Sequence, residues 1–126
     1  MKQIISSDKA PQAIGPYSQA VVYGGLAYLS GQIPLDPETN TMVADDIIVQ
    51  ARRVLDNLKA VLEGCGSSME KVLKTTIYIA DMSEFPQVND IYGEYFTANW
   101  PARATIQAAK LPRGARIEID CIAIAG

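Results

Sequence analysis

The sequence predicts an α+β fold, a two-layer sandwich in which two helices cover one face of a mixed β-sheet. Two observations lead to this prediction. Runs rich in β-branched and aromatic residues lie near both ends of the chain and in its middle, and two segments between them place an apolar residue at every third or fourth position. A chain of 126 residues without a linker or repeat predicts a single domain, residues 1–126.

A hairpin is predicted near the N-terminus. Residues 20–23 and 26–30 are β-prone, and Gly24 and Gly25 between them are a strong turn signal. Residues 2–5 form a further candidate strand. Proline, aspartate and asparagine residues between positions 34 and 40 then indicate an irregular loop.

The first helix is predicted over residues 47–62, where apolar residues recur at helical spacing. Asp45 or Asp46 is placed to cap its start, and Gly64 or Gly66 is placed to end it in a left-handed conformation. Residues 42–46, just before the helix, either border a pocket or form a surface loop.

A third strand and the second helix follow. Residues 73–79 (LKTTIYI) are rich in β-branched side chains and predict a strand. Ser83 is placed to cap a helix whose apolar stripe runs from Phe85 to Trp100, and Pro101 is expected to end it.

Two further strands close the chain, and they are predicted to pair as a hairpin around the loop of residues 110–114. In this register Gln107 faces Glu118, which leaves Arg103 roughly 13 Å from Glu118 along the strands. Alternation places Arg103 and Thr105 on one face of their strand. Within one hairpin, the Arg103 and Glu118 side chains would therefore be too far apart to form an ion pair.

These charges lie among residues that are expected to be buried. Arg103 has small apolar neighbours, and Glu118 stands between Ile117 and Ile119. An unpaired buried charge costs several kcal/mol, roughly. Arg103 therefore either binds a small anionic ligand or lies near a glutamate of another subunit, and an inter-subunit cleft would satisfy both. The alternative is an arginine bonded to backbone carbonyls and a glutamate on the surface.

The composition excludes several kinds of chemistry. Eleven lysines and arginines against 14 acidic residues give a net charge of −3, so no broad basic surface is available for nucleic acid. The chain contains no histidine, which excludes Ser-His-Asp and Cys-His catalysis. Cysteines and carboxylates also lack the spacing of a metal site, so no metal is expected.

Location is predicted from what the sequence lacks. No stretch approaches the ~20 apolar residues of a membrane helix, and the N-terminal residues lack the apolar core of a signal peptide. Cys65 and Cys121 lie far apart and form no CxxC motif, so both are expected to be reduced thiols. The prediction is a cytoplasmic protein without a membrane partner.

Six motifs follow one another along nearly the whole chain. They are IGPYSQAV (14–21), LSGQIPLDP (29–37), KTTIYIADMSEF (74–85), VNDIYGEYF (88–96), PARAT (101–105) and KLPRGARIEID (110–120). In this order they closely resemble the Rid family, also called the YjgF family, and within it the RidA subgroup of enamine/imine deaminases.

The resemblance implies a fold like that of Bacillus chorismate mutase, assembled as a homotrimer with a cleft between each pair of subunits. It also implies hydrolysis of short 2-imino acids, such as 2-iminopropanoate and 2-iminobutanoate, to 2-oxo acids and ammonium. These imines arise from enamines released by pyridoxal-phosphate-dependent serine and threonine dehydratases. The reaction needs no cofactor.

Particular positions match the residues that line the family's cleft. Arg103 matches the arginine that binds the substrate carboxylate, and Glu118 matches the glutamate that holds or activates the attacking water. The other matching cleft residues are Tyr17, Ser30 and Asn89. Gly31 lies where the chain is expected to pass close to the ligand, which suits a residue without a side chain.

One position departs from the family pattern. Many members have a cysteine where this chain has Thr105, so thiol-based regulation is not expected here. A threonine hydroxyl can still orient water, and we include Thr105 with Arg103 and Glu118 as a candidate catalytic residue.

Two rival functions remain at this point. The first is a non-catalytic trimeric module that uses the Arg103 cleft to bind small 2-oxo acids or a partner protein. The second is RNA cleavage, which has been attached to relatives; the net negative charge and the absence of histidine argue against it.

Overall fold

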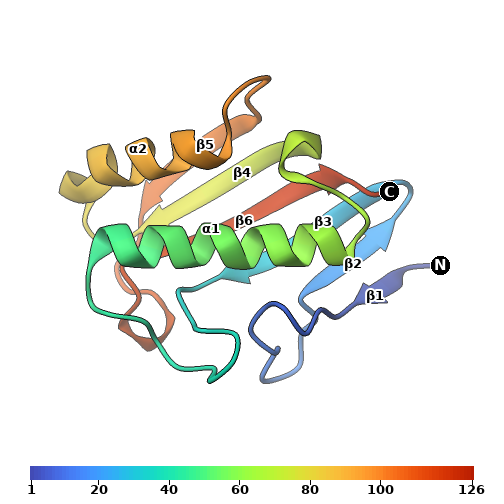
Figure 1. Ribbon diagram of the computed structural model, residues 1–126, viewed down its shortest axis with the longest axis horizontal. Coiled ribbons are helices and arrows are strands. Elements are labelled where there is room, and N and C mark those ends of the chain that lie inside the picture. The colour runs from blue at the N-terminus through green and yellow to red at the C-terminus, as the bar shows by residue number, and fades with distance from the viewer.

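Both long helices lie on one face of a single six-stranded sheet in the computed structural model, which describes residues 1–126 (Figure 1). The helices are α1 (Ile47–Gly64) and α2 (Phe85–Tyr95). The strands are β1 (Gln3–Ile5), β2 (Ala20–Tyr23), β3 (Leu26–Gln32), β4 (Val72–Ile79), β5 (Ala102–Gln107) and β6 (Ile117–Ile124). This arrangement confirms the predicted α+β class and the order of its elements.

The order of strands across the sheet is β1-β2-β3-β6-β4-β5, which corrects the prediction for the end of the chain. β5 and β6 do not form a hairpin, because β4 lies between them: β4 pairs parallel with β5 and antiparallel with β6. The physical reason is the crossover through α2, which returns the chain to the start of a parallel neighbour. The predicted pairing of Gln107 with Glu118 is therefore wrong.

The ends of α1 agree with the sequence. Asp46 caps the helix, and its Oδ1 accepts hydrogen bonds from the amides of Ile48 (2.9 Å) and Val49 (3.0 Å). Gly66 follows the last turn with a φ of 70°, the left-handed conformation that a glycine adopts at low cost.

α2 is shorter than its apolar stripe predicts. It begins at Phe85, and the preceding 3₁₀ turn is capped by Asp81, whose carboxylate accepts from the amide of Ser83. It ends at Tyr95, because Phe96 is extended (φ −115°). Trp100 lies beyond the helix, and its indole N–H bonds back to the Phe96 carbonyl at 2.9 Å. The prediction that Ser83 caps a helix running to Trp100 is wrong at both ends.

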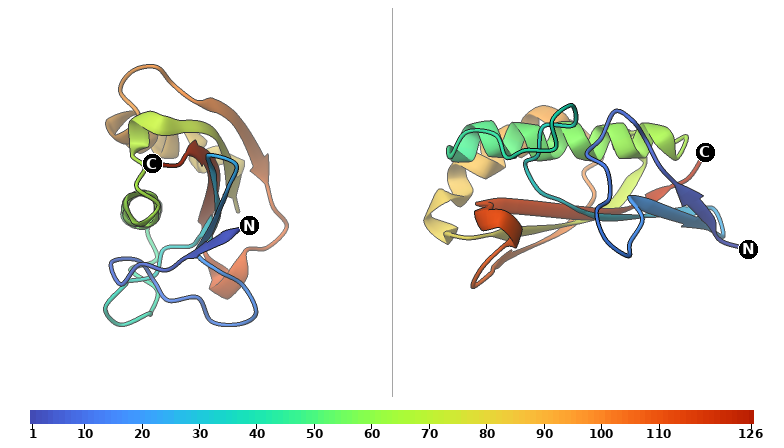
Figure 2. Two further views of the ribbon diagram at one scale, coloured as in Figure 1. Left: turned by 90° about the vertical axis from the view of Figure 1, so that its right-hand side faces the viewer. Right: turned by 90° about the horizontal axis from the view of Figure 1, so that it is seen from below.

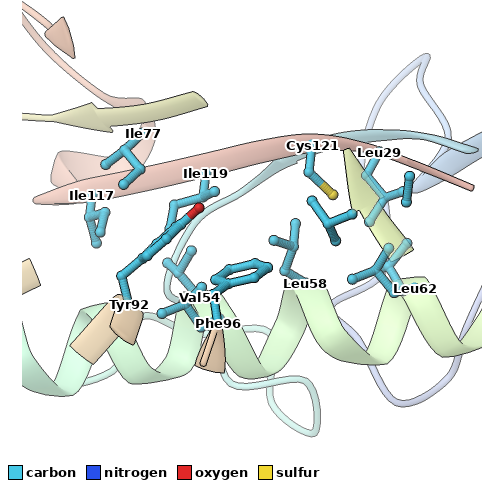
Figure 3. Packing of buried hydrophobic residues seen from close by; sticks show 14 of the residues in the cluster. Leu29, Val54, Leu58, Leu62, Ile77, Tyr92, Phe96, Ile117, Ile119 and Cys121 are labelled. Atoms are coloured by element: carbon cyan, nitrogen blue, oxygen red, sulfur yellow. The ribbon is translucent and has the colours of Figure 1, made fainter. Parts of the chain in front are cut away.

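The core lies between the helices and the sheet (Figure 3). Alternate residues of the central strand β6 point into it, and they meet the apolar stripe of α1. Fully buried members of this layer are Val54, Leu55, Leu58, Leu62, Ile77, Ile117 and Ile119.

Truncation of Leu58 should therefore destabilise the fold. Leu58 has no exposed surface. We expect Leu58→Ala to lower the free energy of unfolding by about 2–5 kcal/mol, because the lost burial is joined by the cost of a cavity. Urea titration measures this loss. Lys59→Ala, at the next and exposed position, should stay within about 0.5 kcal/mol of wild type.

Neither α1 nor α2 lies over the opposite face of the sheet (Figure 2). Tyr28, Ile106 and Ile124 leave 45–49% of their surface exposed, and they come from three different strands. Glu118 and Asp120 share this uncovered face of β6, since the alternate residues Ile117, Ile119 and Cys121 are buried toward the helices. No helix of the structure has the length and apolar character needed to cross a membrane.

Candidate active site

Arg103 leaves β5 on the helix-covered face of the sheet. Its neighbour on β4 is Thr75, whose hydroxyl is hydrogen-bonded to the Tyr92 hydroxyl of α2 at 2.8 Å. The guanidinium carbon lies 4.9 Å from the ring centroid of Tyr92 and 5.3 Å from that of Phe85. One Nη donates to Asn89 Oδ1 at 2.8 Å. Positions 85, 89 and 92 share one side of α2, so one helix side fixes the guanidinium.

No carboxylate neutralises Arg103. The ion pairs of the chain join Arg52 to Glu94, and Arg116 to Asp45 and Glu84. The one hydrogen bond of the Arg103 side chain goes to an amide oxygen, so the alternative of an arginine satisfied by backbone carbonyls is wrong. Arg103 instead borders a hollow of about 530 Å³ with Asn89, Trp100 and Pro101. The guanidinium retains donors for an anion that reaches this hollow.

Glu118 lies on the uncovered face, opposite Tyr78 of β4. Burial raises the pKa of Glu118 above its ordinary value, and the nearby charge of Asp120 raises that pKa further. Asp120 itself accepts a hydrogen bond from the Tyr78 hydroxyl at 3.1 Å. A carboxyl group with a raised pKa can take up and release a proton closer to neutral pH, as acid–base chemistry requires.

Gly31 lies in a β-bulge that brings β3 against Glu118. The β3–β6 register shifts between Leu29 and Gln32, so one extra residue of β3 is left unpaired there. A Cβ at Gly31 would lie 2.8 Å from Glu118 Cδ, and it would lie closer still to Oε2. Glycine is therefore needed at position 31 because the Glu118 carboxylate occupies the space of a side chain.

Ser30 and Tyr17 border the same hollow as Gly31 and Glu118, which has a volume of about 550 Å³. The Ser30 hydroxyl donates to the Ser18 carbonyl at 2.6 Å, and the Ser30 amide donates to the Gln19 carbonyl. These bonds hold the segment that carries Tyr17, whose ring is exposed. Ser30 thus positions this segment, and it borders the hollow.

Within one chain, the predicted residues divide into two groups. Tyr17, Ser30, Gly31 and Glu118 border one hollow, and Asn89 and Arg103 border the other. Along β4, the Arg103 and Glu118 positions are three residues apart, and they lie on strands at either side of it. Strand spacing puts their backbones about 14 Å apart, on opposite faces of the sheet. A single chain does not bring these two side chains together.

The remaining candidate, Thr105, lies on β5 opposite Ile77 and shares the face of Arg103. Its side chain is half-buried, and no hydrogen bond of its hydroxyl is present. Within this chain, Ile33, Leu35 and Asn40 of the preceding loop border the Glu118 hollow, whereas residues 42–46 do not.

Sequence reasoning missed several residues at or beside these hollows. The two rings beside Arg103 belong to Phe85 and Tyr92, and their spacing with Asn89 on a helix was the signal that could have found them. Arg113 and Asn40 border the Glu118 hollow. No group of three or more histidine, cysteine or acidic side chains is arranged to hold a metal ion.

Comparison with known proteins assigns the class to which this fold and site belong. A family model described as Endoribonuclease L-PSP matches residues 7–125, so the chain belongs to this family, the Rid family. It is 53% identical to Protein DfrA of Myxococcus xanthus over 98% of this chain and 95% of that protein. It is 45% identical to the human 2-iminobutanoate/2-iminopropanoate deaminase, over 100% and 92% of the two chains.

Solved structures show the same fold. The Rid-family protein YyfA of Yersinia pestis, a protein of unknown function, superposes with a TM-score of 0.97 at 47% identity, covering 99% of this chain and 100% of that one. TdcF of E. coli, solved with bound serine, has a TM-score of 0.93 at 38% identity and covers 98% and 99%.

Proposed function

We propose that this protein hydrolyses short 2-imino acids, such as 2-iminopropanoate and 2-iminobutanoate, to 2-oxo acids and ammonium. The observation that carries the proposal is the Arg103 guanidinium, which two rings and an amide hold in place without an acidic partner. A carboxylate fits such a guanidinium through paired N–H···O bonds. The human relative's name gives this activity, and the serine bound to TdcF is a small acid of similar size.

The reaction adds one water and releases one ammonia. Water attacks the imine carbon, its oxygen becomes the 2-oxo group, and the carbon–nitrogen bond breaks as the nitrogen leaves protonated. Arg103 holds the substrate carboxylate, and Glu118 accepts a proton from the attacking water. Asn89 keeps the guanidinium in position, and the Thr105 hydroxyl orients water beside it. An imine is already electrophilic, so positioning and proton transfer are the main demands.

The active form in this proposal is a homotrimer of the Bacillus chorismate mutase type, located in the cytosol. Arg103, Asn89 and Thr105 of one subunit would face Glu118, Gly31, Ser30 and Tyr17 of the next. This pairing explains why the two groups lie on opposite faces of the sheet. The apolar side chains on the uncovered face would be buried between subunits.

Mass measurement in solution tests the trimer. A chain of 13.6 kDa gives a trimer of about 41 kDa (three times 13.6), which light scattering resolves from other states. A monomer that hydrolyses imines at full rate would refute the shared site.

A coupled assay tests the activity itself. A threonine dehydratase supplies the enamine and imine, semicarbazide traps the imine that remains, and the trapped product is followed over time. We expect the protein to reduce the trapped fraction in proportion to its concentration. Wild type that matches buffer, yet binds 2-oxobutanoate, would instead support a non-catalytic module that binds 2-oxo acids.

Substitution of Gly31 should separate activity from folding. The added methyl of Gly31→Ala meets the movable end of Glu118, so the carboxylate must turn away while the strand remains paired. We expect kcat/KM to fall about 10- to 100-fold, because displacements near 1 Å cost that much. Gly64→Ala, whose added Cβ would meet its nearest neighbours at 3.4–4.0 Å and which borders neither the Glu118 hollow nor the Arg103 hollow, is the matched control. Full activity in Gly31→Ala would contradict this geometry.

A further inference from the structure

A guanidinium, that of Arg113, borders the same hollow as Glu118. Arg113 lies in the connection between β5 and β6 and borders this hollow together with Asn40. One Nη of Arg113 donates to the Asn40 backbone carbonyl at 3.1 Å. Two loops that are far apart in sequence thus meet at one corner of the hollow.

Both residues hold an unfavourable backbone conformation. Arg113 and Asn40 each have a φ of 58°, and Asn99 is the only other non-glycine residue with a positive φ. This region is crowded for a residue with a Cβ, and such positions gather at ligand-binding sites. The conformation places the Arg113 side chain beside the hollow.

Apart from the bond of Arg113 to the Asn40 carbonyl, the polar side-chain groups at this corner lack partners within the chain. Arg113 has no carboxylate within ion-pair distance, although five other acidic and basic side chains of the chain form such pairs. Asn40 Oδ1 is buried without a hydrogen-bond partner. A bound carboxylate would pair with the Arg113 guanidinium through charge-assisted hydrogen bonds.

The hollow is also large for a short acid. Its volume is about 550 Å³, and cavities of roughly 300–1,000 Å³ hold drug-sized molecules. A four-carbon imino acid is much smaller than this hollow, which both Glu118 and Arg113 border. An acidic side chain on the substrate would reach toward Arg113.

We propose that Arg113 binds an anionic group at the end of the substrate side chain, so that the protein also accepts dicarboxylic 2-imino acids such as 2-iminoglutarate. This inference rests on the proposed function, since it assigns a side-chain subsite to the same reaction. The chemistry is unchanged: water supplies the 2-oxo oxygen, ammonia leaves, and the distal carboxylate takes no part.

The experiment compares 2-iminoglutarate, generated from glutamate, with 2-iminobutanoate, generated from 2-aminobutanoate. One L-amino-acid oxidase preparation, or two matched oxidases, produces the two imines. The measured quantity is the ratio of kcat/KM for 2-iminoglutarate to kcat/KM for 2-iminobutanoate. We expect Arg113→Gln to lower this ratio about tenfold or more, because a charge-assisted pair is lost. Added salt should lower the wild-type ratio through screening.

Two further variants separate the subsite from a general effect. Lys110→Gln removes the same charge from an exposed position of the same connection that does not border the hollow, and it should leave the ratio unchanged. Arg113→Lys retains a cation and should keep an intermediate ratio. Thermal unfolding of each variant shows whether the connection remains folded.

The two imines distinguish the possible failures. If wild type hydrolyses 2-iminobutanoate but not 2-iminoglutarate, the Arg113 subsite is overturned and the proposed function stands. The same conclusion follows if both imines are hydrolysed and Arg113→Gln leaves the ratio unchanged. Hydrolysis of neither imine above the buffer rate overturns both.

Discussion

Replacement of Arg103 by alanine is expected to lower kcat/KM for 2-iminobutanoate by about 10²- to 10⁴-fold. Two charge-assisted hydrogen bonds to the substrate carboxylate would be lost, at about 1.5–3 kcal/mol each, and every 1.4 kcal/mol is a factor of ten. The loss should appear in both KM and kcat, because the carboxylate also orients the imine carbon toward the water. Single-substrate kinetics with oxidase-generated imine measure both constants.

Two variants make this result specific to the guanidinium. Arg103→Lys keeps the charge without the planar fork, so it should recover only part of the activity. Arg52→Ala removes an equal charge from an exposed ion pair with Glu94, and it should remain close to wild type. The assignment of Arg103 as the carboxylate ligand is contradicted if Arg103→Ala retains wild-type kcat/KM while its fold is intact.

The fold class was accessible from sequence because it depends on local periodicity. The spacing of apolar residues in α1 and the Gly24-Gly25 turn between β2 and β3 depend on neighbours a few positions away. Such local patterns predict a helix or a turn in any fold that buries one face of the element. Asp46 as N-cap of α1 is confirmed for the same reason.

Strand order was not accessible from the same signals. β5 and β6 are consecutive, and consecutive strands commonly pair, yet β4 inserts between them. Two features of the sequence pointed to this insertion. The strand–helix–strand segment from β4 to β5 is the usual unit of parallel pairing, and the connection over residues 108–116 is longer than a typical hairpin loop.

For the candidate site as well, the sequence indicated which residues matter but not how they are arranged in space. Arg103 and Glu118 stood out as charges in apolar strands, which is a statement about composition and alternation. Their separation on opposite faces of the sheet depends on the register of β4 with both neighbours, which local patterns do not contain. Arg113 was missed because its conformation and its contact with Asn40 are long-range features.

Replacement of Glu118 by glutamine should produce a protein of greatly reduced activity that is more stable than wild type at neutral pH. Loss of the proton acceptor should reduce kcat by about 10²- to 10⁴-fold, the usual contribution of general acid–base catalysis. Burial, and then the charge of Asp120, raises the pKa of Glu118, so folding favours its protonated form. Glutamine resembles that form in shape and charge.

The sign of the stability effect follows from this pKa. The stabilising contribution of protonated Glu118 is fully present below the unfolded-state pKa, and it is lost as pH rises through the higher folded-state pKa. At neutral pH, ionised Glu118 therefore lowers the free energy of unfolding, and Glu118→Gln removes this cost. The difference between the two proteins should shrink as the pH falls through the titration of Glu118.

Urea titrations at several pH values, with parallel imine assays, measure both effects. Glu70→Gln removes the same charge from an exposed position, so its stability should show no such pH-dependent difference from wild type. An active Glu118→Gln protein would contradict the role of Glu118 as proton acceptor, and one less stable than wild type at neutral pH would show that this carboxyl group serves the fold. If Glu118→Gln gains stability and loses activity, the Glu118 carboxylate is held in a poorly solvated position because the reaction needs it there.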